Sequence, residues 1–153
     1  MRPCRFGMVL PGAVVVVCAA PLAAAGAADA GAAPAAVAVT QAGTWGQAIG
    51  VPGLGALNKG GGAQVLSVSC PSAGNCAAGG FYLDSSQHGQ GFVVSERNGT
   101  WGKAIEVPGS AALNVGGDAF VDSVSCASAG ECSAGGSYRD GSLHGQGFIV
   151  SQT

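Results

Sequence analysis

The sequence predicts an all-β protein built from two tandem repeats, each contributing four antiparallel strands. Residues recur 56 positions apart, as Trp45 does at Trp101, and the copies 43–98 and 99–153 align without insertion or deletion. Each copy contains short runs in which apolar and small polar residues alternate between turn-forming residues. Sustained helical periodicity is found only near the N-terminus. These three observations favour strands over helices throughout the repeats.

The N-terminal 35 residues are predicted to be a signal peptide followed by an Ala-rich segment. Two arginines precede an apolar run over 6–20, which is too short to span a bilayer. Small residues suited to cleavage place the processing site between about residues 27 and 35. We therefore expect a secreted protein with no transmembrane segment, whose β-repeat domain occupies 36–153.

Four strands are expected in each copy and are clearest between residues 65 and 107. The first is an alternating run at 65–70, the second, at 76–82, follows a turn, and the third is the aromatic and β-branched run 90–95. The fourth, 100–107, follows Asn98-Gly99, a pair that tolerates the positive φ angles of a tight hairpin. One complete set of strands is therefore a four-stranded meander.

A four-stranded unit of this length, joined to the next by the Gly-rich links 53–62 and 109–118, is typical of one blade of a β-propeller. A β-trefoil and a small β-sandwich are the alternatives. Propellers contain about four to eight blades, so two repeats do not close a ring.

The sequence copies are out of phase with the sets of four strands. Thr44–Val51 resembles a fourth strand placed before the complete set, and Val37–Val39 falls where a third strand would precede it. The final set reaches only its third strand, at 149–151. We therefore expect that Thr44–Val51 of one molecule completes the last sheet of another, which gives a homo-oligomer by strand exchange. A small monomer or a truncated propeller with a tolerated free edge is the alternative.

Four cysteines follow the signal peptide, and an even number in a secreted chain predicts disulfides. Each copy repeats the same spacing, which favours the pairs Cys70–Cys76 and Cys126–Cys132. A zinc site is disfavoured because the short C-x2-C spacing is missing and no histidine accompanies the thiols.

Charge is sparse, at 9% of residues, and the formal net charge is −2. A nucleic-acid partner requires a basic stripe, which this composition does not provide. We therefore exclude nucleic acid as a partner.

The runs 67–80 (S-V-S-C-P-S-A-G-N-C-A-A-G-G) and 92–101 resemble the S-x-S-C…C-x-A-G-G repeat proteins that high-GC actinobacteria export. The resemblance covers nearly the whole chain after the signal peptide. It implies propeller-type repeats in an extracellular setting. Because those proteins mostly lack an assigned activity, the resemblance implies no catalytic residue.

The two histidines each lie four residues after an aspartate, in the pairs Asp84–His88 and Asp140–His144. Such a pair could ligate a divalent cation if carbonyls or a neighbouring copy supplied the remaining ligands. The simpler interpretation, which we favour, is that each aspartate accepts hydrogen bonds from turn amides and each histidine bonds locally. No cofactor is expected.

A serine hydrolase is disfavoured because the sequence has no G-x-S-x-G elbow. Four aromatic residues, Trp45, Trp101, Tyr82 and Tyr138, could offer stacking platforms for sugar rings, with packing between sheets as the alternative. The sequence therefore favours a secreted, non-enzymatic module that binds extracellular carbohydrate or cell-surface components. The alternatives are a structural, oligomerising scaffold and a metal-dependent hydrolase built on the Asp–His pairs.

Overall fold

The structure is a computed structural model, and it describes residues 43–153. The expected signal peptide over 1–35 and the expected strand at Val37–Val39 lie outside the described residues. The chain divides into two units, Met1–Thr44 and Trp45–Thr153, and the fold below is that of the second unit. None of the helices in the described residues is long and apolar enough to cross a membrane.

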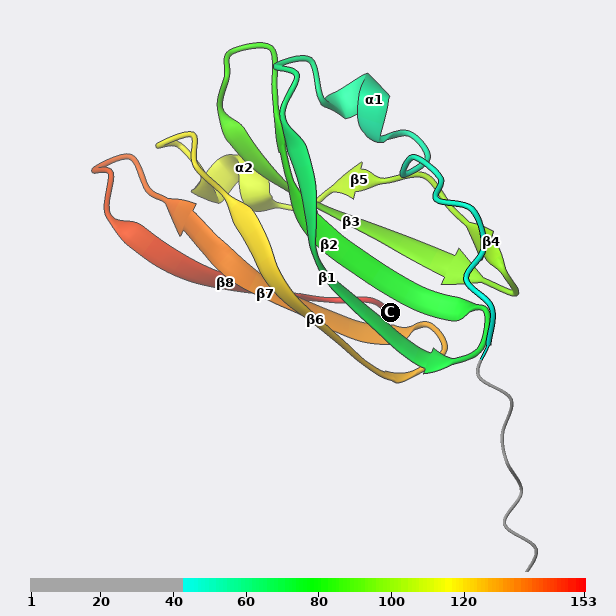
Figure 1. Cartoon of the computed structure of the whole chain (residues 1–153). Helices are drawn as coiled ribbons and strands as arrows, with labels where there is room; N and C mark the ends of the chain where they lie inside the picture. The colour runs from blue at the N-terminus through cyan, green and yellow to red at the C-terminus, as the bar shows by residue number, and fades with distance from the viewer. Residues whose placement is uncertain (1–42) are drawn as a thin grey trace, which may run out of the picture. The chain divides into compact units, whose positions relative to one another are not determined.

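Two antiparallel sheets make up this unit (Figure 1). The first has the order β1-β2-β3-β4, and β5 also pairs with β3; the second has the order β6-β7-β8. The strands of the first sheet are β1 (Ala63–Ser72), β2 (Asn75–Leu83), β3 (Gly89–Arg97), β4 (Thr100–Trp101) and β5 (Ile105–Glu106). Those of the second are β6 (Phe120–Ser128), β7 (Glu131–Arg139) and β8 (Gly145–Ser151). The predicted all-β class is confirmed.

The Gly-rich links each contain one helical turn that the sequence did not indicate. These are α1 (Leu54–Leu57) and α2 (Ser110–Leu113), and each follows a glycine with positive φ, Gly53 or Gly109. A four-residue helix is too short to leave a periodic signal in the sequence. Each Gly-rich link therefore also contains one turn of helix.

The predicted fourth strand over 100–107 is interrupted in the structure. It forms two short strands, β4 and β5, because the amide of Ala104 turns away from β3 and donates to the carbonyl of Pro52 at 2.8 Å. Gly102 still donates to the carbonyl of Ser95 at 2.8 Å. The hairpin before this strand forms as predicted, with φ of 50° at Asn98 and 78° at Gly99.

Both predicted disulfides are present, Cys70–Cys76 and Cys126–Cys132. Each joins two neighbouring strands of one sheet, close to the turn that connects them. Each sheet therefore carries its own cross-link at the end of its first hairpin.

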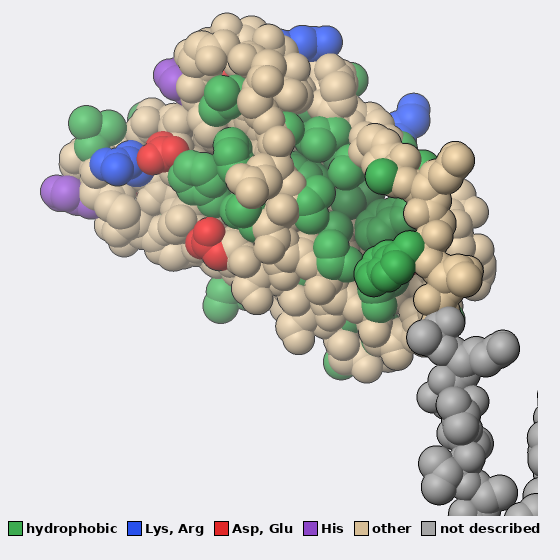
Figure 2. Space-filling view, viewed as in Figure 1, with side chains coloured by type: hydrophobic (Ala, Val, Ile, Leu, Met, Phe, Trp, Pro, Cys, Tyr) green, Lys and Arg blue, Asp and Glu red, His purple; other side chains and the backbone are tan. Residues whose placement is uncertain are grey.

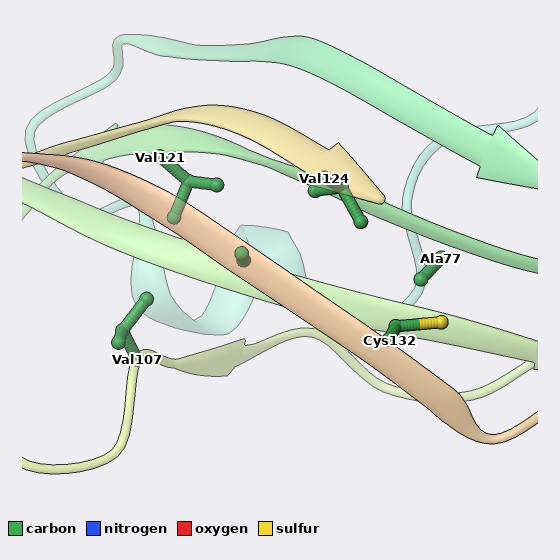
Figure 3. Packing of buried hydrophobic residues seen from close by; sticks show 6 residues of the cluster. Ala77, Val107, Val121, Val124 and Cys132 are labelled. Atoms are coloured by element: carbon green, nitrogen blue, oxygen red, sulfur yellow. The ribbon is translucent and has the colours of Figure 1, made fainter. Parts of the chain in front are cut away.

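The main core forms where the second sheet packs on one face of the first (Figure 3). Its buried members come from both sheets and include Val121, which has no exposed surface. They are Ala77, Val107, Val121, Val124, Cys132 and Ala134. A smaller cluster on the opposite face of the first sheet contains Ala78, Tyr82, Phe92, Val94 and Ala104, packed with Val51, Leu54, Leu57 and Trp101.

Polar contacts also cross the interface between the sheets. The amides of Val124 and Cys126 donate to the hydroxyls of Ser67 and Ser69 at 3.0 and 3.1 Å. At Gly79 the sheets approach so closely that an added Cβ would lie 2.5 Å from Cγ1 of Val121. The small residues of β2 therefore permit a close approach of the two layers.

We expect Gly79→Ala and its repeat counterpart Gly135→Ala to differ in stability. The new Cβ at 79 meets Val121, whereas at 135 the nearest atom is the carbonyl oxygen of Phe148 at 3.7 Å. Gly79→Ala should therefore lower the free energy of unfolding by about 1–3 kcal/mol, and Gly135→Ala should change it by less than about 0.5 kcal/mol. Urea denaturation of dilute protein measures both, and equal stabilities would contradict the close packing at Gly79.

Candidate interaction site

The Asp–His loops have the geometry of carboxylate-capped turns. In the first loop, Oδ1 of Asp84 accepts the amides of Ser86 at 2.7 Å and His88 at 3.1 Å, and Oδ2 accepts Nε2 of Gln90 at 2.9 Å. The Gln90 hydrogen bond, with support from the amides of His88 and Ser86, holds the pKa of the Asp84 carboxyl below its ordinary value against a smaller effect of burial. This carboxylate is occupied within its own loop.

The second loop repeats this arrangement. Asp140 accepts the amides of Ser142 and His144, both at 2.9 Å, and Nε2 of Gln146 at 3.1 Å. The amide of His144 and then the Gln146 side chain lower the pKa of Asp140. The role of these two glutamines was not predicted from the sequence, although each lies six residues after the aspartate of its own copy.

The two candidate metal pairs do not gather further ligands. The ring of His144 lies 3.8 Å from the carboxylate of Asp140, and the ring of His88 packs against Gly117. Within residues 43–153, no group of three or more His, Cys, Asp and Glu side chains is placed to hold a metal ion. The described geometry is that of a hydrogen-bonded turn.

The four aromatic candidates lie in different environments. Tyr82 is 3% exposed and donates to Oε2 of Glu106 at 3.0 Å, and burial followed by this bond raises the pKa of its hydroxyl. Trp101 packs partly buried against the smaller core cluster, and Tyr138 is half-buried. Trp45 is fully exposed, at 101%, so its ring alone among the four is entirely uncovered.

A groove of about 480 Å³ lies between the two sheets and combines residues from both. The first sheet and the link after it contribute Ile105 and Pro108, and the second contributes Val124, Ala134 and Val150. Its lining also includes the end of β8 and the residue after it, Ser151 and Gln152. The groove is mostly apolar and lies beside an edge of the second sheet.

A smaller groove of about 180 Å³ lies on the opposite face of the first sheet. Ile49, Pro52, Val68, Ala78 and Val94 line it, and each corresponds by the repeat to a residue of the larger groove. The smaller groove is also lined by Val51, Val65 and the side chain of Trp101, none of which has a counterpart among the residues that line the larger groove. Neither groove was predicted from the sequence, because each depends on the contact between layers.

The outward faces of the two sheets differ in character. The first sheet exposes apolar side chains there, with Val65 38% and Val68 55% exposed. The second sheet exposes Ile149 at 82% among small polar residues such as Ser133 and Ser151. Hydrophobic side chains gather on the first sheet beside the segment that runs into α1 (Figure 2).

The edge of the second sheet at β8 is open within the described residues, because β8 pairs only with β7. Conversely, Thr44–Val51 forms no strand in the structure, and Trp45 and Ile49 are 101% and 68% exposed. The segment expected to act as a fourth strand and the edge that lacks one are therefore both without a strand partner in the described part of the chain.

Comparisons with known proteins gave no match to any family model, any curated protein or any solved structure.

We expect the aspartate turns to make stability depend on acidity. A carboxyl whose pKa is lowered by folding stabilises the protein fully above its unfolded pKa of about 4, and this contribution disappears as the pH falls through the folded pKa. Asp84→Asn together with Asp140→Asn should therefore lower Tm near pH 6 and reduce the further drop in Tm toward about pH 2.5. Thermal unfolding followed by circular dichroism measures this. The control Asp122→Asn, outside these loops, should keep the wild-type drop; an unchanged drop in the double variant would contradict the assignment.

Proposed function

We propose that this chain is a secreted, non-enzymatic repeat module that stacks head to tail with further copies of itself into a larger, propeller-type assembly. The two disulfides fit an extracellular protein. The hydrogen-bonded aspartate turns favour a structural role for these loops over a hydrolytic one.

The proposal rests on the fact that the two sheets meet inside the chain through different faces. The second sheet uses the face that carries Val121 and Val124, and the first uses the opposite face, which carries Ala77 and Val93. By the repeat, the first sheet's outward face carries Val65 and Val68, counterparts of Val121 and Val124. A contact of this kind between copies is heterologous, so it propagates until a ring closes or a filament forms.

Counterparts of the polar contacts also lie on the outward faces. Ser67 and Ser69 accept the amides of β6 inside the chain, and their counterparts Ser123 and Ser125 are exposed on the second sheet. The backbone of Gly89 exchanges hydrogen bonds with the following link at 2.9 Å, to the carbonyl of Gly117 and from the amide of Ala119. We expect Gly145 to make the same two bonds with the link of the next copy.

The contact between copies would be more polar than the one inside the chain. Inside, the rings of Phe81 and Phe120 meet edge to face with centroids 5.0 Å apart. Their counterparts are Ser137 and Gln64, which carry no such apolar surface. This substitution suits faces that meet water before assembly, because a large exposed aromatic patch would favour nonspecific association. If each chain contributes the two sheets of residues 43–153, about four to eight blades per propeller predict closed rings of two to four chains.

A second candidate function, carbohydrate binding, is favoured by one observation, the complete exposure of Trp45. Exposed indole rings stack on sugar faces. A glycan array with wild-type protein and Trp45→Ala tests it. Loss of binding in the variant would support stacking on Trp45, and no binding by either protein would contradict it.

We expect the secreted protein to form a discrete oligomer in size-exclusion chromatography with light scattering. Ile149→Asp should give a monomer with wild-type thermal stability, because it places a charge on the outward face of β8 and leaves the core of the chain untouched. Val115→Lys is the matched control: Val115 is 69% exposed in a link, and the first copy has Lys59 at this position. It should assemble like the wild type. A wild-type monomer at every concentration would contradict the proposal.

A further inference from the structure

We propose that the larger groove is a binding site for Trp45 of a second copy, and that the segment Thr44–Val51 of that copy adds to the second sheet at β8. This inference rests on the proposed head-to-tail assembly and specifies the contact that would hold it together.

The two grooves are related by the 56-residue repeat. Both have the same wall residues in corresponding positions: Pro52 and Pro108, Val68 and Val124, Ala78 and Ala134, Val94 and Val150. Trp101 lines the smaller groove and has no counterpart among the residues that line the larger one. The larger groove is correspondingly more open, about 480 Å³ against about 180 Å³. It therefore has the walls of a tryptophan site without the tryptophan.

The proposed occupant, Thr44–Val51, repeats the segment that completes the first sheet. Thr44-Trp45-Gly46 repeats Thr100-Trp101-Gly102, and Ile49 and Val51 repeat Ile105 and Val107. Trp45 is fully exposed and Ile49 is 68% exposed, so both have apolar surface to bury. The segment therefore offers the same side chains, at the same spacing, that complete the first sheet.

The first sheet shows the register in which such a segment pairs with a sheet edge. There, the amides of Gly102 and Val107 donate to the carbonyls of Ser95 and Gly91 at 2.8 and 2.9 Å. By the repeat, Gly46 and Val51 of the second copy should donate to the carbonyls of Ser151 and Gly147. The edge of β8 that would accept these bonds is unpaired within residues 43–153. Strand addition of this kind combines main-chain hydrogen bonds with side-chain pockets.

The segment that enters the larger groove comes from a second copy and not from the same chain. Val51, at the end of the segment, packs with the cluster on the far face of the first sheet. The larger groove lies on the other side of that sheet, between it and the second sheet. The first sheet thus separates the segment from the groove of its own chain.

The test compares Trp45→Ala with Gln47→Ala in the full chain. Gln47 is the matched control, because its counterpart Lys103 is exposed in the completed sheet. Light scattering over a concentration series should show that Trp45→Ala weakens assembly by at least about 30-fold, as expected for a buried tryptophan at an interface centre. Gln47→Ala should assemble like the wild type, and acrylamide should quench Trp45 less in the oligomer than in the Ile149→Asp monomer. Undiminished assembly of Trp45→Ala, together with equal quenching of Trp45 in the wild-type oligomer and in the Ile149→Asp monomer, would overturn the tryptophan site. The head-to-tail assembly would then still stand.

A synthetic peptide of residues 43–52 separates the two proposals if the wild type is a monomer. Added to the wild-type chain, it should shift the methyl resonances of Val124 and Val150, which line the larger groove. A peptide with alanine in place of the tryptophan should bind at least about 30-fold more weakly. No binding, equal binding of both peptides, or shifts at Val65 and Val68 of the smaller groove instead would overturn the tryptophan site.

Discussion

The packing of Val121 over Gly79 is the contact on which the rest of the molecule depends. Gly79, in the middle of β2, lets the second sheet approach the first more closely than a side chain would allow. At that distance the hydroxyls of Ser67 and Ser69 reach the backbone of β6, and Val121 of β6 is fully covered. Because this glycine recurs in β7 as Gly135, the second sheet offers the same kind of surface on its outward side.

This packing gives the unit a direction. Each sheet packs on one neighbour with one face and on the other neighbour with its opposite face. A linear stack of such sheets therefore leaves one face uncovered at each end, whatever the number of repeats. The two grooves, the open edge of β8 and the unpaired segment before α1 are consequences of the same directionality. They are also the features with apolar surface still to be buried, which is why the proposed function concerns assembly.

Local signals in the sequence were sufficient for the strands, the hairpin at Asn98-Gly99 and both disulfides, because each depends on residues close together in the chain. The division of the fourth strand was not predictable, since the amide of Ala104 leaves β3 for Pro52, a residue far away in sequence. The helical turns in the links are too short to have a period. Both grooves require the distance between sheets, which follows from the contact at Gly79 and not from any alternation within a strand.

The position of the disulfides has a consequence for how such a chain can change in length. Each bond joins two cysteines six residues apart, within one copy and within one sheet. A duplication or deletion of one whole 56-residue unit therefore adds or removes both partners of a bond at once. No thiol is orphaned by such an event, and the oxidative pairing of the remaining units is unaffected. The disulfides therefore place no constraint on the number of repeats. The number of repeats can change with the size of the assembly without leaving a cysteine unpaired.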